Sequence, residues 1–454
     1  MSGDERFGKM LQNPQFCIYI EVPAGKQNLE LLKNLSSDEG VFGTVVTGQI
    51  AGGDAYLRSC EECMAVTARP VMAVLSGANV TEEQMRVSLE NLRAQGVRDF
   101  LCVTGDISIE HKDLSNSTGV PLQDVAYPYL ESTKVIRQVM ETGEDDVVGA
   151  VVNPFKYLPE DLIVQYTKMQ RKLNLGACFL VAQIGWDLKK HQELIWYLRA
   201  HGLLTPVLAR LAFLRERDGQ RLSAGLFPGV PVPLWLSAAI SREANSQDFL
   251  RTQALRMAFF AIGCRHLGYS GIVVNGIETP EELRFFLDAY EDLIAKYPNY
   301  AAWVKLAQER LKDVALVPFD DAFVERAPFY LYQRLLDPQV RDFDSYDARS
   351  VRPAIAKPSL SDRMEAFLTT HSTPQWIRKM ARKKFPGVMR KQEELCFGLD
   401  GSSCPKHLLE GPCGGALLDG RCECGNGDCF FHRVLRIVQH QGKLAELEGS
   451  AETR

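Results

Sequence analysis

The stretch PVMAVLSGANVTEEQMRVSLENLRAQGVRDFLCVTGD, residues 70–106, contains one complete strand–helix–strand unit. It begins with the apolar run PVMAVL, passes through a segment with apolar residues at helical spacing, and returns to the apolar run DFLCVT. Short apolar runs that do not alternate with polar residues are typical of parallel strands, which are buried on both faces. The glycine that closes the middle segment is a common helix end. The stretch therefore predicts two parallel strands joined by a helix.

The same pattern extends in both directions along the chain. The eight apolar runs are FCIYIE (16–21), FGTVVT (42–47), PVMAVL (70–75), DFLCVT (99–104), VVGAVV (147–152), CFLVAQ (178–183), TPVLAR (205–210) and GIVVNG (271–276). Eight strands separated by helices over about 250 residues fit an α/β protein of the (β/α)8 or TIM-barrel type. The rival is a doubly wound open sheet, but no G-x-G-x-x-G sequence follows the first strand to support it. We therefore predict a barrel.

Composition and charge exclude several classes of protein. The 454 residues are 46% hydrophobic and 24% charged, which is ordinary for a globular protein. A net charge of -5 argues against a general nucleic-acid binder, whose surface is basic. No run of eighteen apolar residues is present, and the first sixteen residues lack the apolar core of a secretory signal. We expect a cytoplasmic protein with no membrane span and no nucleic-acid partner.

Cysteine placement divides the chain. Six of the twelve cysteines fall within residues 396–429, and the others are scattered. In a reducing compartment, such a cluster is more typical of a metal site than of disulfides. Helical patterns continue beyond residue 280, and irregular, proline-containing sequence follows to about residue 360. We therefore predict a barrel over 1–285, a helical extension and linker over 286–360, and a small cysteine-rich metal-binding domain over 361–454.

Polar residues stand at the ends of several predicted strands. They are Glu21, Thr47, Gly105 with Asp106, Gln183 with the nearby Asp187, and Arg210. Any one of them, taken alone, is better explained as a helix cap or a loop contact. Together they converge on the carboxyl-terminal face of the barrel, where TIM-barrel chemistry takes place. Their joint placement predicts an active site there.

These segments resemble the methylenetetrahydrofolate reductase family over roughly residues 15–280. The resemblance is carried by IYIEVPAG (18–25), by the stretch 70–106, and by QRKLNLGACFLVAQIGWD (170–187). It implies an oxidoreductase that reduces 5,10-methylenetetrahydrofolate to 5-methyltetrahydrofolate with a flavin, either FAD or FMN. In such enzymes the flavin supplies the hydride chemistry, and the protein positions and tunes it.

The resemblance also assigns roles to single residues. Opening the five-membered ring of the substrate requires protonation of a tertiary nitrogen, and Glu21 matches the glutamate that acts as general acid. Asp106 matches the carboxylate that faces the flavin and stabilises the cationic intermediate. Gln183 matches the residue that contacts the pterin; Asp187, in the same phase, and Arg210, at the end of its strand, are also expected to bind substrate. The resemblance implies that Thr47, Gly105, Asp106 and Lys172 bind the cofactor, and Tyr157, at a position where the family has a histidine, is expected to bind it as well.

Two departures from the family pattern fall on the flavin side. Where the family carries a histidine in its third strand, this chain has Ala73 or Val74. Where a second histidine follows the fifth strand, it has Lys156 or Tyr157. The choice between FAD and FMN therefore stays open.

The segment 396–432, CFGLDGSSCPKHLLEGPCGGALLDGRCECGNGDCFFH, resembles the C-terminal domain associated with reductases of anaerobic and acetogenic bacteria. The preferred metal ligands are Cys404, Cys413, Cys422 and Cys429, with Cys396 and Cys424 as alternates. Four thiolates suit either zinc or a 4Fe-4S cluster. Beside a flavin we favour the cluster, which relays electrons.

A basic run, WIRKMARKKFPGVMRK (376–391), precedes this segment. A solvated surface is the ordinary explanation of such a run, but it would also steer an acidic electron carrier such as ferredoxin or a reductase subunit. Two other functions remain open, namely a folate-binding subunit without redox activity and a methyltetrahydrofolate-dependent methyltransferase barrel with a structural zinc tail. An oligomer is possible on either account.

Overall fold

The computed structural model describes residues 16–25, 29–37, 40–48, 53–105, 129–143, 145–215, 217–218, 229–313, 328–344, 349–369, 376, 396–424 and 427–449. Eight parallel strands close into a barrel in sequence order, and β8 pairs with β1 to close it. The strands are β1 (Cys17–Pro23), β2 (Gly43–Thr47), β3 (Val71–Ser76), β4 (Asp99–Val103), β5 (Val147–Val152), β6 (Phe179–Ala182), β7 (Val207–Ala212) and β8 (Gly271–Asn275). Each overlaps the apolar run predicted for it, so the (β/α)8 barrel is confirmed.

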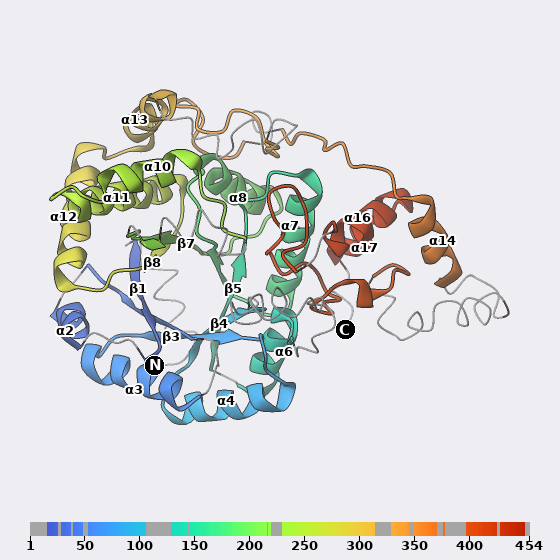
Figure 1. Cartoon of the computed structure of the whole chain (residues 1–454), viewed down its shortest axis with the longest axis horizontal. Helices are drawn as coiled ribbons and strands as arrows, with labels where there is room; N and C mark the ends of the chain where they lie inside the picture. The colour runs from blue at the N-terminus through green and yellow to red at the C-terminus, as the bar shows by residue number, and fades with distance from the viewer. Residues whose placement is uncertain are drawn as a thin grey trace.

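Helices surround the strands, and further helices follow the barrel (Figure 1). Those of the barrel and its extension are α2 (Leu29–Ser37), α3 (Asp54–Thr67), α4 (Glu82–Ala94), α6 (Ser132–Thr142), α7 (Pro159–Asn174), α8 (Leu188–Ala200), α10 (Leu234–Glu243), α11 (Phe249–Leu267), α12 (Pro280–Lys296) and α13 (Tyr300–Asp313). The C-terminal region adds α14 (Leu360–Thr369), the short 3-10 helix η3 (Gly401–Ser403), α16 (Phe430–His440) and α17 (Leu444–Gly449). No helix in the described part of the chain is both long and apolar enough to cross a bilayer.

The helix in the opening stretch shows how the sequence sets local structure. At the start of α4, the Thr81 hydroxyl accepts a hydrogen bond from the Gln84 backbone N–H at 3.2 Å. In return, Gln84 Oε1 accepts one from the Thr81 N–H at 2.9 Å. This reciprocal pair satisfies two N–H groups that a helix start leaves without partners. Beyond the last turn, Gly96 has a φ of 91°, a conformation that favours glycine.

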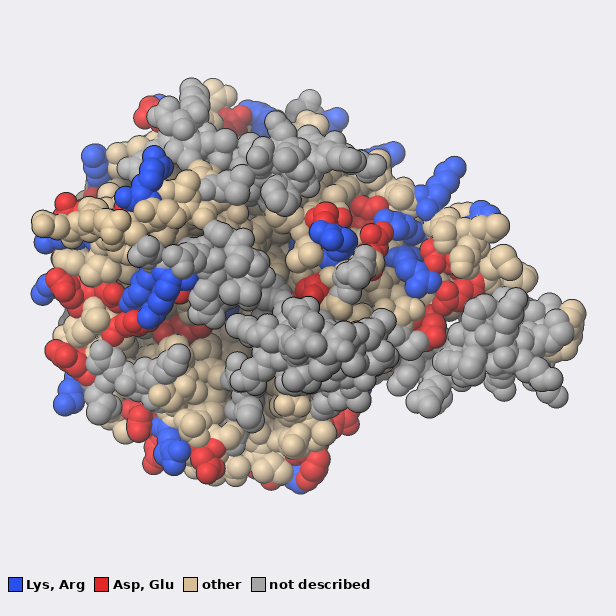
Figure 2. Space-filling view, in the orientation of Figure 1, with Lys and Arg blue, Asp and Glu red and all other residues tan. Residues whose placement is uncertain are grey.

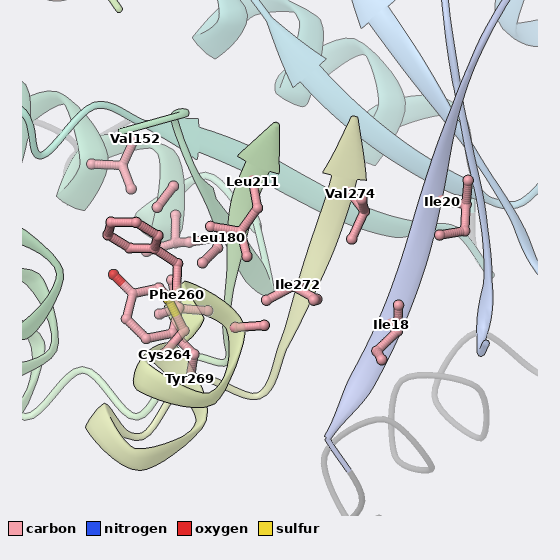
Figure 3. Packing of buried hydrophobic residues seen from close by; sticks show 14 of the residues in the cluster. Ile18, Ile20, Val152, Leu180, Leu211, Phe260, Cys264, Tyr269, Ile272 and Val274 are labelled. Carbon is pink, nitrogen blue, oxygen red and sulfur yellow. The ribbon is translucent and has the colours of Figure 1, made fainter. Parts of the chain in front are cut away.

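Both faces of the barrel strands are buried, which explains their continuous apolar sequence. The outward face packs on the helices. Ile18 and Ile20 of β1 and Ile272 of β8 belong to the same core as Phe260 of α11 (Figure 3). The inward face fills the barrel with a second, separate set of side chains. These are Cys17, Tyr19, Val45, Met72, Val74, Leu101, Val147, Phe179, Val181, Leu208 and Val273.

In the described residues between β7 and β8, α10 is followed by α11, which begins directly after Asp248. The described parts of the predicted linker, 328–344 and 349–359, contain no helix or strand, in keeping with their irregular sequence. The linker is nevertheless fixed to α8, because Lys190 Nζ donates to the Phe329 carbonyl at 2.8 Å and the Leu331 backbone N–H donates to Glu193 Oε2.

The C-terminal region packs against α7 and α6 on one side of the barrel (Figure 1). Arg137 of α6 donates two hydrogen bonds to the Glu410 carboxylate, at 2.8 and 2.9 Å. His432 Nε2 and Asp161 Oδ1 of α7 lie 2.6 Å apart, and both residues are buried. Val164 of α7 also belongs to the apolar core of the C-terminal region. The cysteine-rich region is therefore docked on the barrel through both polar and apolar contacts.

Candidate active site

Strand alternation decides which polar residues face the inside of the barrel. Successive side chains of a strand point to opposite faces. On β1, Tyr19 fills the interior, so Glu21 lies above it on the same face, toward the carboxyl end of the strand. Six polar residues stand two positions after an interior apolar residue, and they are Glu21, Thr47, Ser76, Gln183, Arg210 and Asn275. Polar side chains from six strands therefore converge at the mouth of the barrel.

Four of these residues, Glu21, Gln183, Arg210 and Asn275, are hydrogen-bonded to one another and are called the mouth group. Arg210 Nε donates to Glu21 Oε2 at 2.7 Å, and its NH2 donates to Oε1 at 2.5 Å. Asn275 Nδ2 donates to the same Oε1 at 2.8 Å. Arg210 NH1 reaches Gln183 Oε1 at 3.4 Å. The two-pronged contact fixes both the position and the plane of the Glu21 carboxylate.

The side chains of the mouth group differ in how far they are exposed to solvent. The Glu21 side chain is 4% exposed, whereas that of Arg210 is 29% exposed. Gln183 is half-buried and offers both donor and acceptor atoms. β1 and β7 each run two residues beyond the ends predicted from sequence, so Glu21 and Arg210 lie inside strands rather than at their tips. Rigid strands thus hold a carboxylate, a guanidinium and two amides where a polar heterocycle can reach them.

Asn275 was not among the residues predicted from sequence. It is the last residue of β8, and its side chain supplies one of the three hydrogen bonds to Glu21. The signal was present in the sequence, because Asn275 follows the interior Val273 by two positions. A search for polar residues in the inward phase of each strand would have found it.

A second polar group joins the C-terminal region to the end of β4. Lys406 Nζ donates to the Gly105 carbonyl at 3.2 Å and to Glu423 Oε1 at 2.7 Å. The Cys413 thiol donates to the same carboxylate oxygen at 3.3 Å. Lys406 and Glu423 are each 2% exposed, and the Lys406 ammonium lies 5.0 Å from the centre of the Tyr129 ring. Lys406, Glu423 and Cys413 are called the bridge group.

The family model for methylenetetrahydrofolate reductase matches residues 24–276, more than half of the chain. The chain belongs to the methylenetetrahydrofolate reductase family. A second family model, methylene-tetrahydrofolate reductase C terminal, matches residues 388–454. The protein is thus an oxidoreductase of the methylenetetrahydrofolate reductase type that carries this C-terminal domain in the same chain.

The other comparisons say less. The comparison with curated proteins found no match. Among solved structures, 2,3-dimethylmalate lyase is 13% identical, with a TM-score of 0.35, and covers 72% of this chain and 91% of its own. A putative deoxyribose-phosphate aldolase from Toxoplasma gondii ME49 is 14% identical, with a TM-score of 0.34, and covers 63% and 98%. A mutant tryptophan synthase alpha-subunit from Pyrococcus furiosus is 14% identical, with a TM-score of 0.33, and covers 62% and 98%.

Two residues expected at the reductase site have other partners here. Asp187 caps α8, accepting hydrogen bonds from the backbone N–H groups of Lys189 and Lys190 at 2.9 and 3.4 Å. It also accepts one from the Tyr157 hydroxyl at 3.1 Å and one from the Tyr330 hydroxyl at 2.7 Å. Burial, followed by the nearby Asp187 carboxylate, holds the pKa of Tyr157 well above its usual range. Both side chains therefore make hydrogen bonds within the protein.

The other positions assigned to the flavin differ in their surroundings. Thr47 ends β2 and is partly exposed. The Gly105 carbonyl accepts from Lys406, and Asp106 lies outside the described residues. Lys172 is buried and donates to the Val151 carbonyl at 2.6 Å, and burial lowers its pKa to about 7. Thr47 is therefore exposed enough to contact a ligand at the mouth, whereas the Gly105 carbonyl, Lys172 and Tyr157 make hydrogen bonds within the protein.

The C-terminal region contacts one of the positions where a family histidine is replaced. At the positions where family histidines are replaced, Val74 fills the barrel interior and Lys156 Nζ donates to the Ala416 carbonyl at 2.7 Å. Asn153 Nδ2, just beyond β5, donates to the Gly414 carbonyl at 3.1 Å. Residues 414–416 therefore lie next to the segment that follows β5.

The six cysteines of the C-terminal region are all described, and all are free thiols. No three His, Cys, Asp or Glu side chains of the described chain are close enough together to hold one metal ion. Burial raises the pKa of Cys413 and of Cys396 to about 12. Cys422 is the exception, because a hydrogen bond from Cys424 lowers its pKa. Most of these thiols thus lie in surroundings that disfavour a bare thiolate.

Proposed function

We propose that this chain catalyses, in the cytoplasm, the flavin-dependent reduction of 5,10-methylenetetrahydrofolate to 5-methyltetrahydrofolate. The observation that carries the proposal is the mouth group, which lies at the carboxyl end of a barrel of the reductase family. Flavin is the general hydride source of the family. The contacts of Lys172 and Tyr157 do not locate it in this chain, so the mechanism below uses the protein's own residues.

Glu21 is the proposed general acid for opening the five-membered ring. In the present arrangement both of its oxygens accept hydrogen bonds from Arg210, and one also accepts from Asn275. To give a proton to the substrate nitrogen, the carboxyl group needs one oxygen free of these donors. We propose that Arg210 exchanges Glu21 for the bound substrate, which its partial exposure permits. Asn275 keeps the carboxyl group in place during this exchange.

Gln183 is the proposed recognition residue for the pterin. Its amide carries a donor and an acceptor, and the edge of a pterin ring presents both. Gln183 Oε1 accepts from the Ile184 backbone N–H at 3.0 Å, and its contact with Arg210 is longer, at 3.4 Å, so only the Arg210 contact can be exchanged for the substrate with little loss. Asp106 keeps its proposed role beside the reacting centre. Asp187 is proposed to influence the site by positioning α8 and Tyr157 rather than by contacting the substrate itself.

Cys404, Cys413, Cys422 and Cys429, with Cys396 and Cys424 as alternates, would hold a 4Fe-4S cluster, which would supply electron relay, and zinc is the alternative metal. Burial is the main cause of the raised pKa of Cys429 and of Cys404. Smaller contributions from Cys413 and Cys404 at Cys429, and from Cys422 at Cys404, support one shared neighbourhood. The thiols must draw together on binding, as metal sites commonly form with their metal. The proposed donor is ferredoxin or a reductase subunit.

The second candidate is a folate-binding subunit without redox activity. It is favoured by the internal contacts of Lys172 and Tyr157, which leave two of the expected flavin contacts unmade. On this account the mouth group binds folate, and the C-terminal domain is a structural zinc module.

Anaerobic purification followed by flavin extraction, metal analysis and an assay separates the two candidates. The reductase account expects bound or reconstitutable flavin, iron with sulfide, and 5-methyltetrahydrofolate formed when reduced methyl viologen is the donor. A protein that binds methylenetetrahydrofolate but takes up no flavin and forms no product would establish the second candidate and reject the first.

A further inference from the structure

The outer face of α14 (Leu360–Thr369) carries exposed apolar side chains. Leu360, Met364 and Phe367 are 65%, 56% and 62% exposed, and their spacing places them on one side of the helix. With Trp376, four of the nine exposed large apolar side chains among the described residues fall within 360–376. Single exposed apolar residues are common, but a concentration of them marks an interaction surface. Figure 2 shows uncharged surface at the edge where Figure 1 places α14.

The inner face of the same helix is attached to the cysteine-rich region. Arg433 of α16 donates to Asp362 at 2.8 Å and to Glu365 at 2.9 Å. Ala366 is buried in the same core as Cys404 and Cys429. α14 thus packs its inner face on the cysteine-rich region and presents the apolar stripe outward. A protein bound to that stripe is separated from the cysteine-rich core by a single helix.

Charge in the sequence identifies the chemistry of the partner. Residues 370–391, which directly follow α14, contain seven Lys and Arg residues and no Asp or Glu, in a chain whose net charge is -5. These charges are tethered to the end of the helix. They attract an acidic surface toward it and speed the encounter.

A second copy of this chain is the less suitable occupant. A two-fold interface through α14 would place two basic runs near each other, and like charges close together oppose association. The three side chains of the stripe also form a small contact, which suits the brief complexes of electron-transfer proteins better than a stable dimer.

We propose that the outer face of α14 is the docking surface for an acidic electron-carrier protein of the ferredoxin kind. The proposal rests on the proposed function, because it takes the cysteine-rich region to be the point where electrons enter. Each docked carrier is oxidised by one electron. Two such encounters, together with two protons, convert one methylene group to one methyl group.

Binding of a reduced, acidic bacterial ferredoxin to the full chain tests the proposal. Isothermal titration at about 50 mM salt is expected to show binding that weakens at about 300 mM. The variant Leu360→Ser/Met364→Ser should bind at least about tenfold more weakly, as expected when apolar anchors are lost. The matched control is Leu204→Ser, which changes a side chain 90% exposed on the barrel and should leave the affinity within about twofold.

Three results would overturn the proposal. The first is ferredoxin binding that is equally tight in the α14 variant, and the second is no binding by the parent at either salt concentration. The third is a sedimentation-velocity result in which the parent protein is a dimer and the α14 variant is a monomer. In that case this face would be the interface between two copies of the chain. Circular dichroism confirms that each variant is folded. Because binding is measured without turnover, a chain that binds ferredoxin but fails the viologen assay would refute the proposed function and leave the docking surface intact.

Discussion

The mouth group and the bridge group each pair a glutamate with a cation near the carboxyl end of the barrel, yet their surroundings differ. In the mouth group the cation, Arg210, is 29% exposed. In the bridge group Lys406 and Glu423 are both 2% exposed, and the Glu423 carboxylate contacts Cys413 as well. An ion pair that is open on one side can exchange a partner for a ligand. A sealed pair holds two parts of a protein together, because breaking it leaves a buried charge.

Lys406→Met tests the sealed pair and should have the largest effect. It leaves the Glu423 carboxylate buried without its cation, which costs about 3–5 kcal/mol of stability. The expected result is a C-terminal region that is cleaved rapidly in limited proteolysis, together with a lower thermal midpoint. Lys406→Met/Glu423→Leu should recover most of the loss, since removal of both charges leaves none unpaired. Lys134→Met is the control, because its 3.7 Å pair with Glu82 is exposed. If the Lys406 and Lys134 variants were cleaved at equal rates, the bridge group would not be what holds the C-terminal region on the barrel.

Glu21→Gln tests the open pair. Turnover of methylenetetrahydrofolate should fall at least about a hundredfold, the scale of lost general acid catalysis. The thermal midpoint should change far less than in the Lys406 variant, because glutamine keeps the size of the side chain. Steady-state assays with reduced methyl viologen provide the measurement, and Glu83→Gln, at an exposed site on α4, is the matched control. Unchanged turnover would remove Glu21 from the acid role.

Arg210→Lys asks whether the open cation meets the substrate. Lysine keeps the charge but loses the two-pronged contact with Glu21. If Arg210 moves to the substrate, KM for methylenetetrahydrofolate should rise about tenfold, the scale of one lost charged hydrogen bond. If the Arg210→Lys variant instead kept the parent KM but had a lower thermal midpoint, the Arg210–Glu21 pair would have a structural role, as the bridge group has.

Asn275→Leu should have the smallest effect. It removes one hydrogen bond that a neutral amide donates to Glu21 and leaves both hydrogen bonds from Arg210, so a loss of about 0.5–1.5 kcal/mol is expected and kcat/KM should fall about two- to tenfold. A loss as large as that of Glu21→Gln would mean that Asn275 contacts the substrate directly.

Sequence alone predicts the barrel and part of its mouth because both follow from periodicity. Buried parallel strands are apolar throughout, and the two-residue period places Glu21, Gln183 and Arg210 on the inner face. The same rule would have included Asn275.

Periodicity along one strand cannot show which of its polar atoms form hydrogen bonds with a segment far away in the sequence. Tyr330 of the linker donates to Asp187, and the C-terminal Lys406 donates to Gly105. Both contacts join residues that are more than a hundred positions apart. The resemblance to the family assigned Asp187 to substrate without taking these segments into account.

The most direct test of the account is a single turnover without oxygen. The protein is reduced, the excess donor is removed, and methylenetetrahydrofolate is added while 5-methyltetrahydrofolate is measured. The account predicts one methyl product for every two electrons stored, formed by the parent and not by Glu21→Gln. No methyl product from fully reduced, flavin-loaded parent protein, or equal product from the Glu21→Gln variant, would contradict it.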